Sequence, residues 1–135
     1  TAMRHPDWQI RIITTIQAAT ERPFCWGEND CCLFVADVCL AACDKDPAAQ
    51  YRGRYTTEIG AKRVLAKTHG SIEAALDALF VRVPIAMAQR GDALVFDGPN
   101  GLTAGVMWAG QVWAMTEQGA RPIPDQVPLI AWRVE

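Results

Sequence analysis

Hydrophobic side chains recur at helical spacing in the first part of the chain and predict two helices there. The first is expected to begin near Pro6 and to end at about Thr20. Its apolar positions lie three or four residues apart: Trp8, Ile12, Ile16 and Ala19. Residues 31–43 are apolar on nearly every side, which predicts a central, buried helix. The side chain of Asn29 is expected to cap the first turn of this second helix.

Two shorter helices and then a sheet are predicted for the rest of the chain. Thr56 or Thr57 is expected to cap a helix that runs to about Lys67, and Gly70 and Ser71 separate it from a fourth helix. After Pro84 the pattern changes to that of strands, separated by turns at 98–101 and 109–110 and by a Pro-rich segment at 122–128. The predicted strands are 92–96, 102–108, 111–115 and 129–134.

Helices followed by a meandering antiparallel sheet indicate the α+β class. The 135 residues are enough for one domain, mainly helical over 1–82 and mainly strands over 83–135. With 50% hydrophobic and 21% charged residues, the composition is that of a globular protein.

The net charge and the length of the longest apolar run argue against nucleic acid and against a membrane span. The net charge is −2 and no segment is strongly basic, so no nucleic acid is expected to bind. The longest apolar run, 31–43, is interrupted by Asp37 and is shorter than the roughly 20 residues of a membrane-spanning helix. Arg11, Thr14 and Thr15 interrupt the apolar positions near the N-terminus, so no secretory signal is expected.

The five cysteines favour a reducing compartment, with most thiols packed as small hydrophobic side chains. Cys31 and Cys32 are adjacent, and Cys39 and Cys43 lie in the same apolar run. A zinc site is the alternative, but the spacing contains no CxxC pair and no nearby histidine. No metal and no cofactor are therefore expected.

The strongest chemical signal is the sequence Asn29-Asp30-Cys31-Cys32 at the start of the apolar helix. A thiol in the first turn faces the positive end of the helix dipole and free amides, which favour the thiolate. The carboxylate of Asp30 acts in the opposite direction and raises the thiol pKa. These residues predict either a nucleophilic cysteine or two cysteines that simply pack.

Residues 24–37, Phe-Cys-Trp-Gly-Glu-Asn-Asp-Cys-Cys-Leu-Phe-Val-Ala-Asp, resemble the nucleophile segment of the NlpC-type cysteine peptidases. These are papain-like enzymes that cut peptidoglycan stem peptides, and their usual pattern is Asp-Cys-Ser-Gly at the start of a buried helix. Residues 90–96 resemble their Pro-Gly-Asp-Leu strand start. More closely, the chain resembles a phage and prophage branch of this superfamily that is associated with tails. That resemblance covers almost the whole chain and includes 6–8, 52–55 and 131–134.

The resemblance implies an NlpC-type, papain-like fold with Cys31 in the position of the nucleophile. Cys32 stands where these enzymes usually carry serine, and Trp26 and Gly27 belong to the same element. Thr103 takes the place of the catalytic histidine, and the segment around Ala114 lies where a third polar residue would orient it. A threonine cannot accept the thiol proton near pH 7. The chain thus lacks general-base help worth about 10²–10⁴-fold.

Neither histidine is expected to replace the missing base. His5 lies in a terminal segment and His69 in the turn between the third and fourth helices, where an exposed imidazole is the usual situation. Whether the chain is an enzyme is therefore left open by the residues.

Asp37 and the tryptophans are interpreted as structural. Asp37, the one charge within the apolar run, is expected to be buried and paired with Arg52, Arg54 or Arg133. Four of the five tryptophans are expected in or near the cleft and the sheet: Trp26, Trp108, Trp113 and Trp132. Core packing is the first interpretation, and an interface with a partner is the alternative.

Together these observations favour a structural component of a long-tailed phage tail tip or baseplate, without catalysis. The alternatives are an active cysteine peptidase or amidase that cuts peptidoglycan as the genome enters the host, and a tail-assembly factor. The expected partners are other tail-tip or baseplate proteins, with peptidoglycan as a further candidate. Synthesis is expected in the bacterial cytoplasm and the final location in the virion tail tip.

Overall fold

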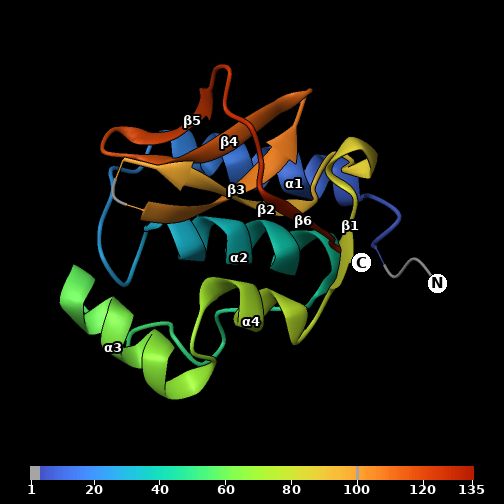
Figure 1. Cartoon of the computed structure of the whole chain (residues 1–135). Helices are drawn as coiled ribbons and strands as arrows, with labels where there is room; N and C mark the ends of the chain where they lie inside the picture. The colour runs from blue at the N-terminus through green and yellow to red at the C-terminus, as the bar shows by residue number, and fades with distance from the viewer. Residues whose placement is uncertain (1–3, 100) are drawn as a thin grey trace.

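Four α-helices come first in the part of the chain that the structure, a computed structural model, describes: residues 4–99 and 101–135 (Figure 1). Their bounds are α1 (Trp8–Thr20), α2 (Cys31–Cys43), α3 (Glu58–Thr68) and α4 (Ile72–Asp77). All four were predicted, with ends within a few residues of those observed. Thr57 and Ser71 cap α3 and α4 by accepting hydrogen bonds from backbone amides three residues later.

A six-stranded antiparallel sheet follows the helices, and it confirms the α+β class. The strands are β1 (Val81–Val83), β2 (Ala93–Gly98), β3 (Gly101–Trp108), β4 (Gln111–Thr116), β5 (Gly119–Ile123) and β6 (Ile130–Arg133), and a 3-10 turn, η1 (Ile85–Met87), follows β1. Their order in the sheet is β1-β6-β2-β3-β4-β5. The hairpin of β2 and β3 pairs Val95 with Ala104, and β4 joins β3 only from Val106 onward.

Two of these strands were not predicted. β1 has only three residues, and its pairing with β6 joins segments some 50 positions apart, which a local pattern cannot reveal. β5 includes Pro122 within the segment that was interpreted as a Pro-rich connection. The proline is tolerated because β5 lies at the edge of the sheet, where its missing amide leaves no ladder bond unmade.

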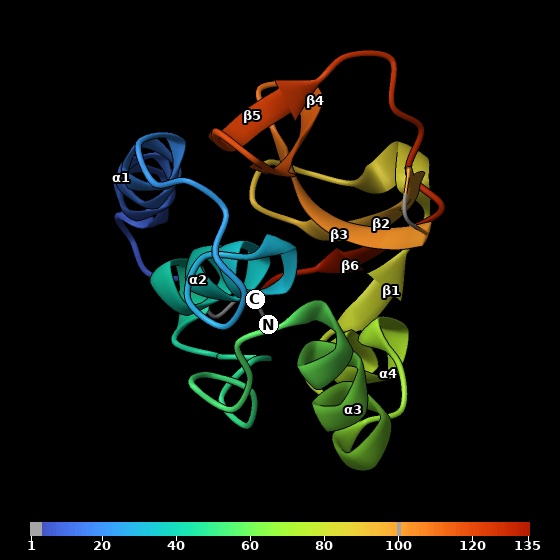
Figure 2. The same cartoon turned by 90° about the vertical axis from the view of Figure 1, so that its left-hand side faces the viewer.

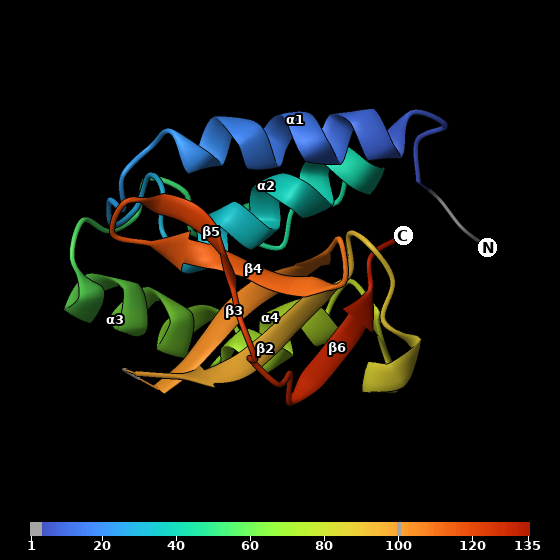
Figure 3. The ribbon, with the colours of Figure 1, turned by 90° about the horizontal axis from the view of Figure 1, so that it is seen from above.

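The helix α2 lies at the centre of the helical layer. It packs against β3 and β4 on one side and against α1 on another, while α1 also reaches β5 (Figure 3). The helices α3 and α4 lie together on the side of α2 away from α1 (Figure 2). Fully buried side chains from α1, α2 and the sheet form the main core, among them Ile12, Phe34, Val38, Val106 and Trp132.

Asp92, directly before β2, ties the two ends of the described chain to the sheet. Its side chain is completely buried. One carboxylate oxygen accepts from Arg4 at 3.0 Å and from the amide of Val134 at 3.0 Å. The other accepts from Arg133 at 3.0 Å and from the amide of Gln89 at 2.8 Å. The buried charge is thus fully satisfied, as a carboxylate in a core must be.

No helix among the described residues combines the length and the apolar character that crossing a membrane requires.

Candidate functional site

The N-terminal tip of α2 is held in place by Asp30. Its backbone is extended, and one carboxylate oxygen accepts from the amide of Leu33 at 3.0 Å. The other accepts from the amide of Gly27 at 3.0 Å and from the hydroxyl of Tyr55 at 2.6 Å. The prediction that Asn29 caps this helix is therefore wrong. The side-chain amide of Asn29 instead donates to the carbonyl groups of residues 22 and 23.

The turn before α2 requires glycine at position 27. Gly27 has φ +83°, which L side chains rarely adopt, and a β-carbon there would lie 2.0 Å from the carbonyl oxygen of Tyr55. The same contact holds the loop that contains Tyr55 against the helix tip. Burial and the neighbouring Asp30 raise the pKa of the Tyr55 hydroxyl, so it stays a hydrogen-bond donor to that carboxylate.

The two cysteines at the helix tip act as a pair. The sulfur atoms of Cys31 and Cys32 are 4.0 Å apart, and both side chains are half-buried. A hydrogen bond from the Cys32 thiol lowers the pKa of Cys31, and the backbone amide of Ala104 lowers it further, against the effects of burial and of Asp30. The shared hydrogen bond and burial raise the pKa of Cys32 well above its ordinary value. Cys31 is thus the thiol that ionises first.

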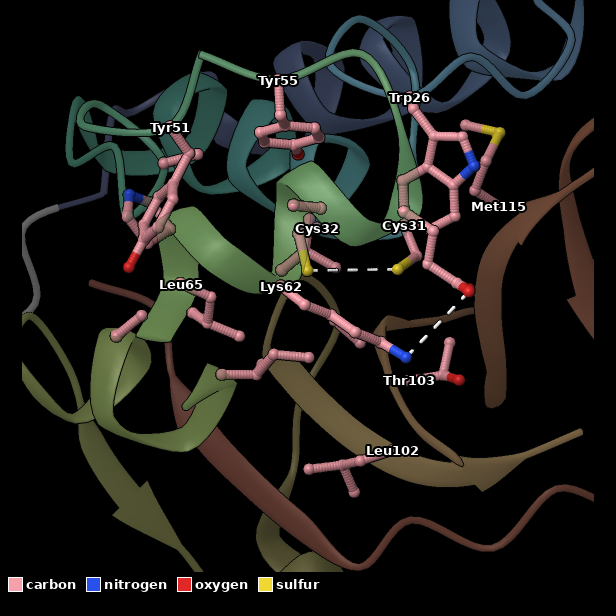
Figure 4. Close-up of a pocket in the computed structure, with 18 of the residues that line it drawn as sticks. Trp26, Cys31, Cys32, Tyr51, Tyr55, Lys62, Leu65, Leu102, Thr103 and Met115 are labelled. Atoms are coloured by element: carbon pink, nitrogen blue, oxygen red, sulfur yellow. Dashed lines mark hydrogen bonds and ion pairs between the residues drawn. The ribbon is translucent and has the colours of Figure 1, made fainter. Parts of the chain in front are cut away.

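A pocket of about 330 Å³ opens above these thiols (Figure 4). Its walls come from the segment before α2 and the start of that helix, from the loop of residues 47–55, from one face of α3, from α4, from β3 with the turn before it, and from β4. Aromatic and aliphatic side chains predominate: Phe24, Trp26, Tyr51, Tyr55, Leu65, Leu76 and Met115. Lys62 and Glu58 are the charged residues of the lining, and their side chains are 4.0 Å apart on α3. This size and lining are typical of small-ligand sites.

The residues expected in the places of the catalytic partners do not form a base. Thr103 lines the pocket, but its hydroxyl donates to the carbonyl of Gly101 at 3.0 Å. The neighbouring Ala104 offers the Cys31 sulfur only its backbone amide, which the ladder of β3 and β4 leaves unused. Ala114 is buried in a different cluster of the core, together with Leu94 and others.

Each histidine contacts a side chain other than the two thiols. Nε2 of His5 lies 2.9 Å from a carboxylate oxygen of Asp44, at the C-terminal end of α2 and thus at the opposite end from Cys31. Nδ1 of His69 is hydrogen-bonded to the hydroxyl of Tyr51. Neither imidazole belongs to the lining of the described pocket. The site therefore holds an ionisable thiol without a histidine base.

Asp37 is only half-buried, which corrects the expectation of a buried carboxylate. Of the three predicted partners, Arg52 is the one that binds it, at 2.8 Å, and Arg22 lies 3.7 Å away. Arg133 binds Asp92 instead. Asp37 therefore lies on the side of α2 that faces Arg52, in the loop of residues 44–57, and Arg22.

The tryptophans divide between core and pocket. Trp132 is fully buried, and Trp108 is nearly so. Trp26 lines the pocket and packs edge-to-face on Phe24 at 4.7 Å between ring centres. Trp113 is half-buried against the main core. Among the described residues, no three histidine, cysteine or acidic side chains converge in a way that could hold a metal ion.

One contact at the pocket was not predicted from the sequence: the hydroxyl of Tyr55 donates to Asp30. A tyrosine near an Asp-capped helix start can form such a bond. Asp92 lies outside the pocket, and its binding of Arg4 and Arg133 was likewise not predicted. The contact of the Ala104 backbone amide with Cys31 could not have been predicted, because almost every residue type has such an amide.

Comparison with known proteins gives a family but no activity. No curated protein matches the sequence. A family model described as a domain of unknown function (DUF6950) matches residues 3–134. Because this match spans nearly the whole chain, the protein belongs to the DUF6950 family.

Proposed function

We propose that the protein is a structural component of a long-tailed phage tail tip or baseplate, built on a degenerate NlpC-type peptidase fold and without catalysis. The observation that carries the loss of catalysis is the surroundings of Cys31. Its sulfur meets a second thiol and a backbone amide, whereas neither imidazole lines the pocket. A cysteine nucleophile needs an adjacent base to act as a hydrolase.

The fold itself supports the NlpC-type assignment. Cys31 begins a buried helix that packs against an antiparallel sheet, in the order that the resemblance implies. The segment 90–96, which resembles the family's strand start, leads into the central strand β2. The assignment to a phage tail comes from the resemblance of the sequence alone.

One observation favours an active cysteine peptidase as the second candidate. The pKa of Cys31 is lowered, and its sulfur faces a pocket large enough for a peptide side chain. In that case water or a substrate group would have to accept the proton that histidine normally takes.

Release of soluble fragments from purified peptidoglycan separates these candidates. The wild type and the Cys31→Ala variant are expected to release equally little, and Cys25→Ala serves as a control because Cys25 is exposed and outside the pocket. Release that is lost in Cys31→Ala but kept in Cys25→Ala would establish the peptidase. The protein composition of purified phage particles tests the location: presence of the chain supports a virion component, and its absence would identify an assembly factor.

A further inference from the structure

The paired thiols at the tip of α2 are not explained by a structural role in a phage tail. Cys31 and Cys32 both line the pocket, and their sulfurs face each other at 4.0 Å (Figure 4). We propose that Cys31 and Cys32 form a two-thiolate binding site for Cu(I). This site goes beyond the proposed function and holds whether or not the protein belongs to a phage tail.

The geometry favours an ion between the sulfurs over a bond joining them. Neighbouring Cα atoms are about 3.8 Å apart, below the roughly 4.4–6.8 Å that disulfides usually span. Closing a disulfide would therefore distort the first turn of α2. By contrast, two metal–thiolate bonds of about 2.3 Å each reach across as much as about 4.6 Å. The observed 4.0 Å lies within that reach.

The donor set selects a soft, low-coordinate ion. Structural zinc needs four ligands, and among the described residues no third histidine, cysteine or acidic side chain joins the pair. Thiolate ligands favour Cu(I), for which two sulfur ligands suffice. Met115 on β4 adds a thioether, another soft donor, to the lining of the same pocket.

The surroundings favour a thiolate at Cys31, and the metal itself has to displace the proton that burial and the shared hydrogen bond hold on Cys32. The backbone amide of Ala104 and the free amides of the first turn of α2 stabilise negative charge on sulfur. The carboxylate of Asp30, next to Cys31, already accepts hydrogen bonds from the amides of Leu33 and Gly27 and from the hydroxyl of Tyr55.

Binding exchanges protons for the metal without any redox step. One Cu(I) ion and two thiols give a bis-thiolate complex of charge −1 and release two protons. Lys62 of the pocket lining has an exposed ammonium group, which lies 4.0 Å from the carboxylate of Glu58.

The test is an anaerobic titration of the full chain with Cu(I) in competition with a chromogenic Cu(I) chelator. We expect one high-affinity ion per chain, and a loss of at least about 100-fold in affinity in Cys31→Ser and in Cys32→Ser, since each removes a direct ligand. Cys25→Ser removes an exposed thiol outside the pocket and should keep the wild-type affinity. If circular dichroism shows that Cys32→Ser does not fold, the Cu(I) affinity of Cys31→Ser alone decides the test.

Wild-type affinity in Cys31→Ser, or an equal loss in Cys25→Ser, would overturn the proposal. Either result is independent of the peptidoglycan and particle experiments, so a failure here leaves the proposed function untouched.

Discussion

At the residue scale, the helix tip depends on a contact between Gly27 and Tyr55. Gly27 adopts a positive φ in the turn before α2. From the sequence we predicted Asn29 as the helix cap, whereas Asp30 is the cap; local sequence does not distinguish them because both side chains cap well. The choice follows from Tyr55, 25 residues away, which donates to Asp30 and makes the aspartate the better-satisfied group.

Replacing Gly27 with alanine should destabilise the protein and disturb the pocket. The left-handed backbone costs about 1–2 kcal/mol for an L-residue, and the new β-carbon would also collide with the backbone of Tyr55. Gly53→Ala is the matched control, since Gly53 also has a positive φ but its β-carbon would meet no atom within 4 Å. Urea unfolding of both variants measures the difference. An equal loss of unfolding free energy in the two variants would show that the close approach of Tyr55 to position 27 adds no cost of its own.

At the scale of elements, patterns within ten or so residues were sufficient for the helices and for four strands. They failed for β1, whose partner β6 lies far away in the sequence, and for β5, which contains Pro122. They also gave no role to Asp92, because its importance arises only when Arg4 and Arg133 from the two ends of the chain converge on it. Such convergence is a property of the tertiary structure.

Asp92→Ala should lower the free energy of unfolding by about 3–5 kcal/mol, because it leaves two partly buried arginines without their shared carboxylate. Asp97→Ala, in the same strand region but exposed, should change it by no more than about 0.5 kcal/mol. Thermal and chemical unfolding of the two variants provide the comparison. A small effect of Asp92→Ala would mean that the arginines find solvent or other partners at little cost.

At the scale of the whole molecule, the pocket forms where helices, hairpin and sheet meet. The lining comes from segments between residues 24 and 115, so the sequence could predict the thiols at its floor but not its walls. The helix α3 closes one side without burying any residue of its own. The apolar run from residue 31 onward predicted that Cys31 lies in the first turn of a buried helix, and only the fold could show that neither imidazole lines the pocket.

The central claim is that Cys31 ionises without help from an imidazole. The direct measurement is the rate of Cys31 alkylation by iodoacetamide as a function of pH, followed by mass spectrometry in the wild type and in a His5→Gln/His69→Gln variant. Because the pKa of Cys31 is lowered whereas burial and Glu28 raise that of Cys25, Cys31 should react at a lower pH than Cys25 in the same protein. The account predicts a single ionisation that is unchanged in the double variant. A reactive plateau at acidic pH that disappears when the imidazoles are removed would contradict it.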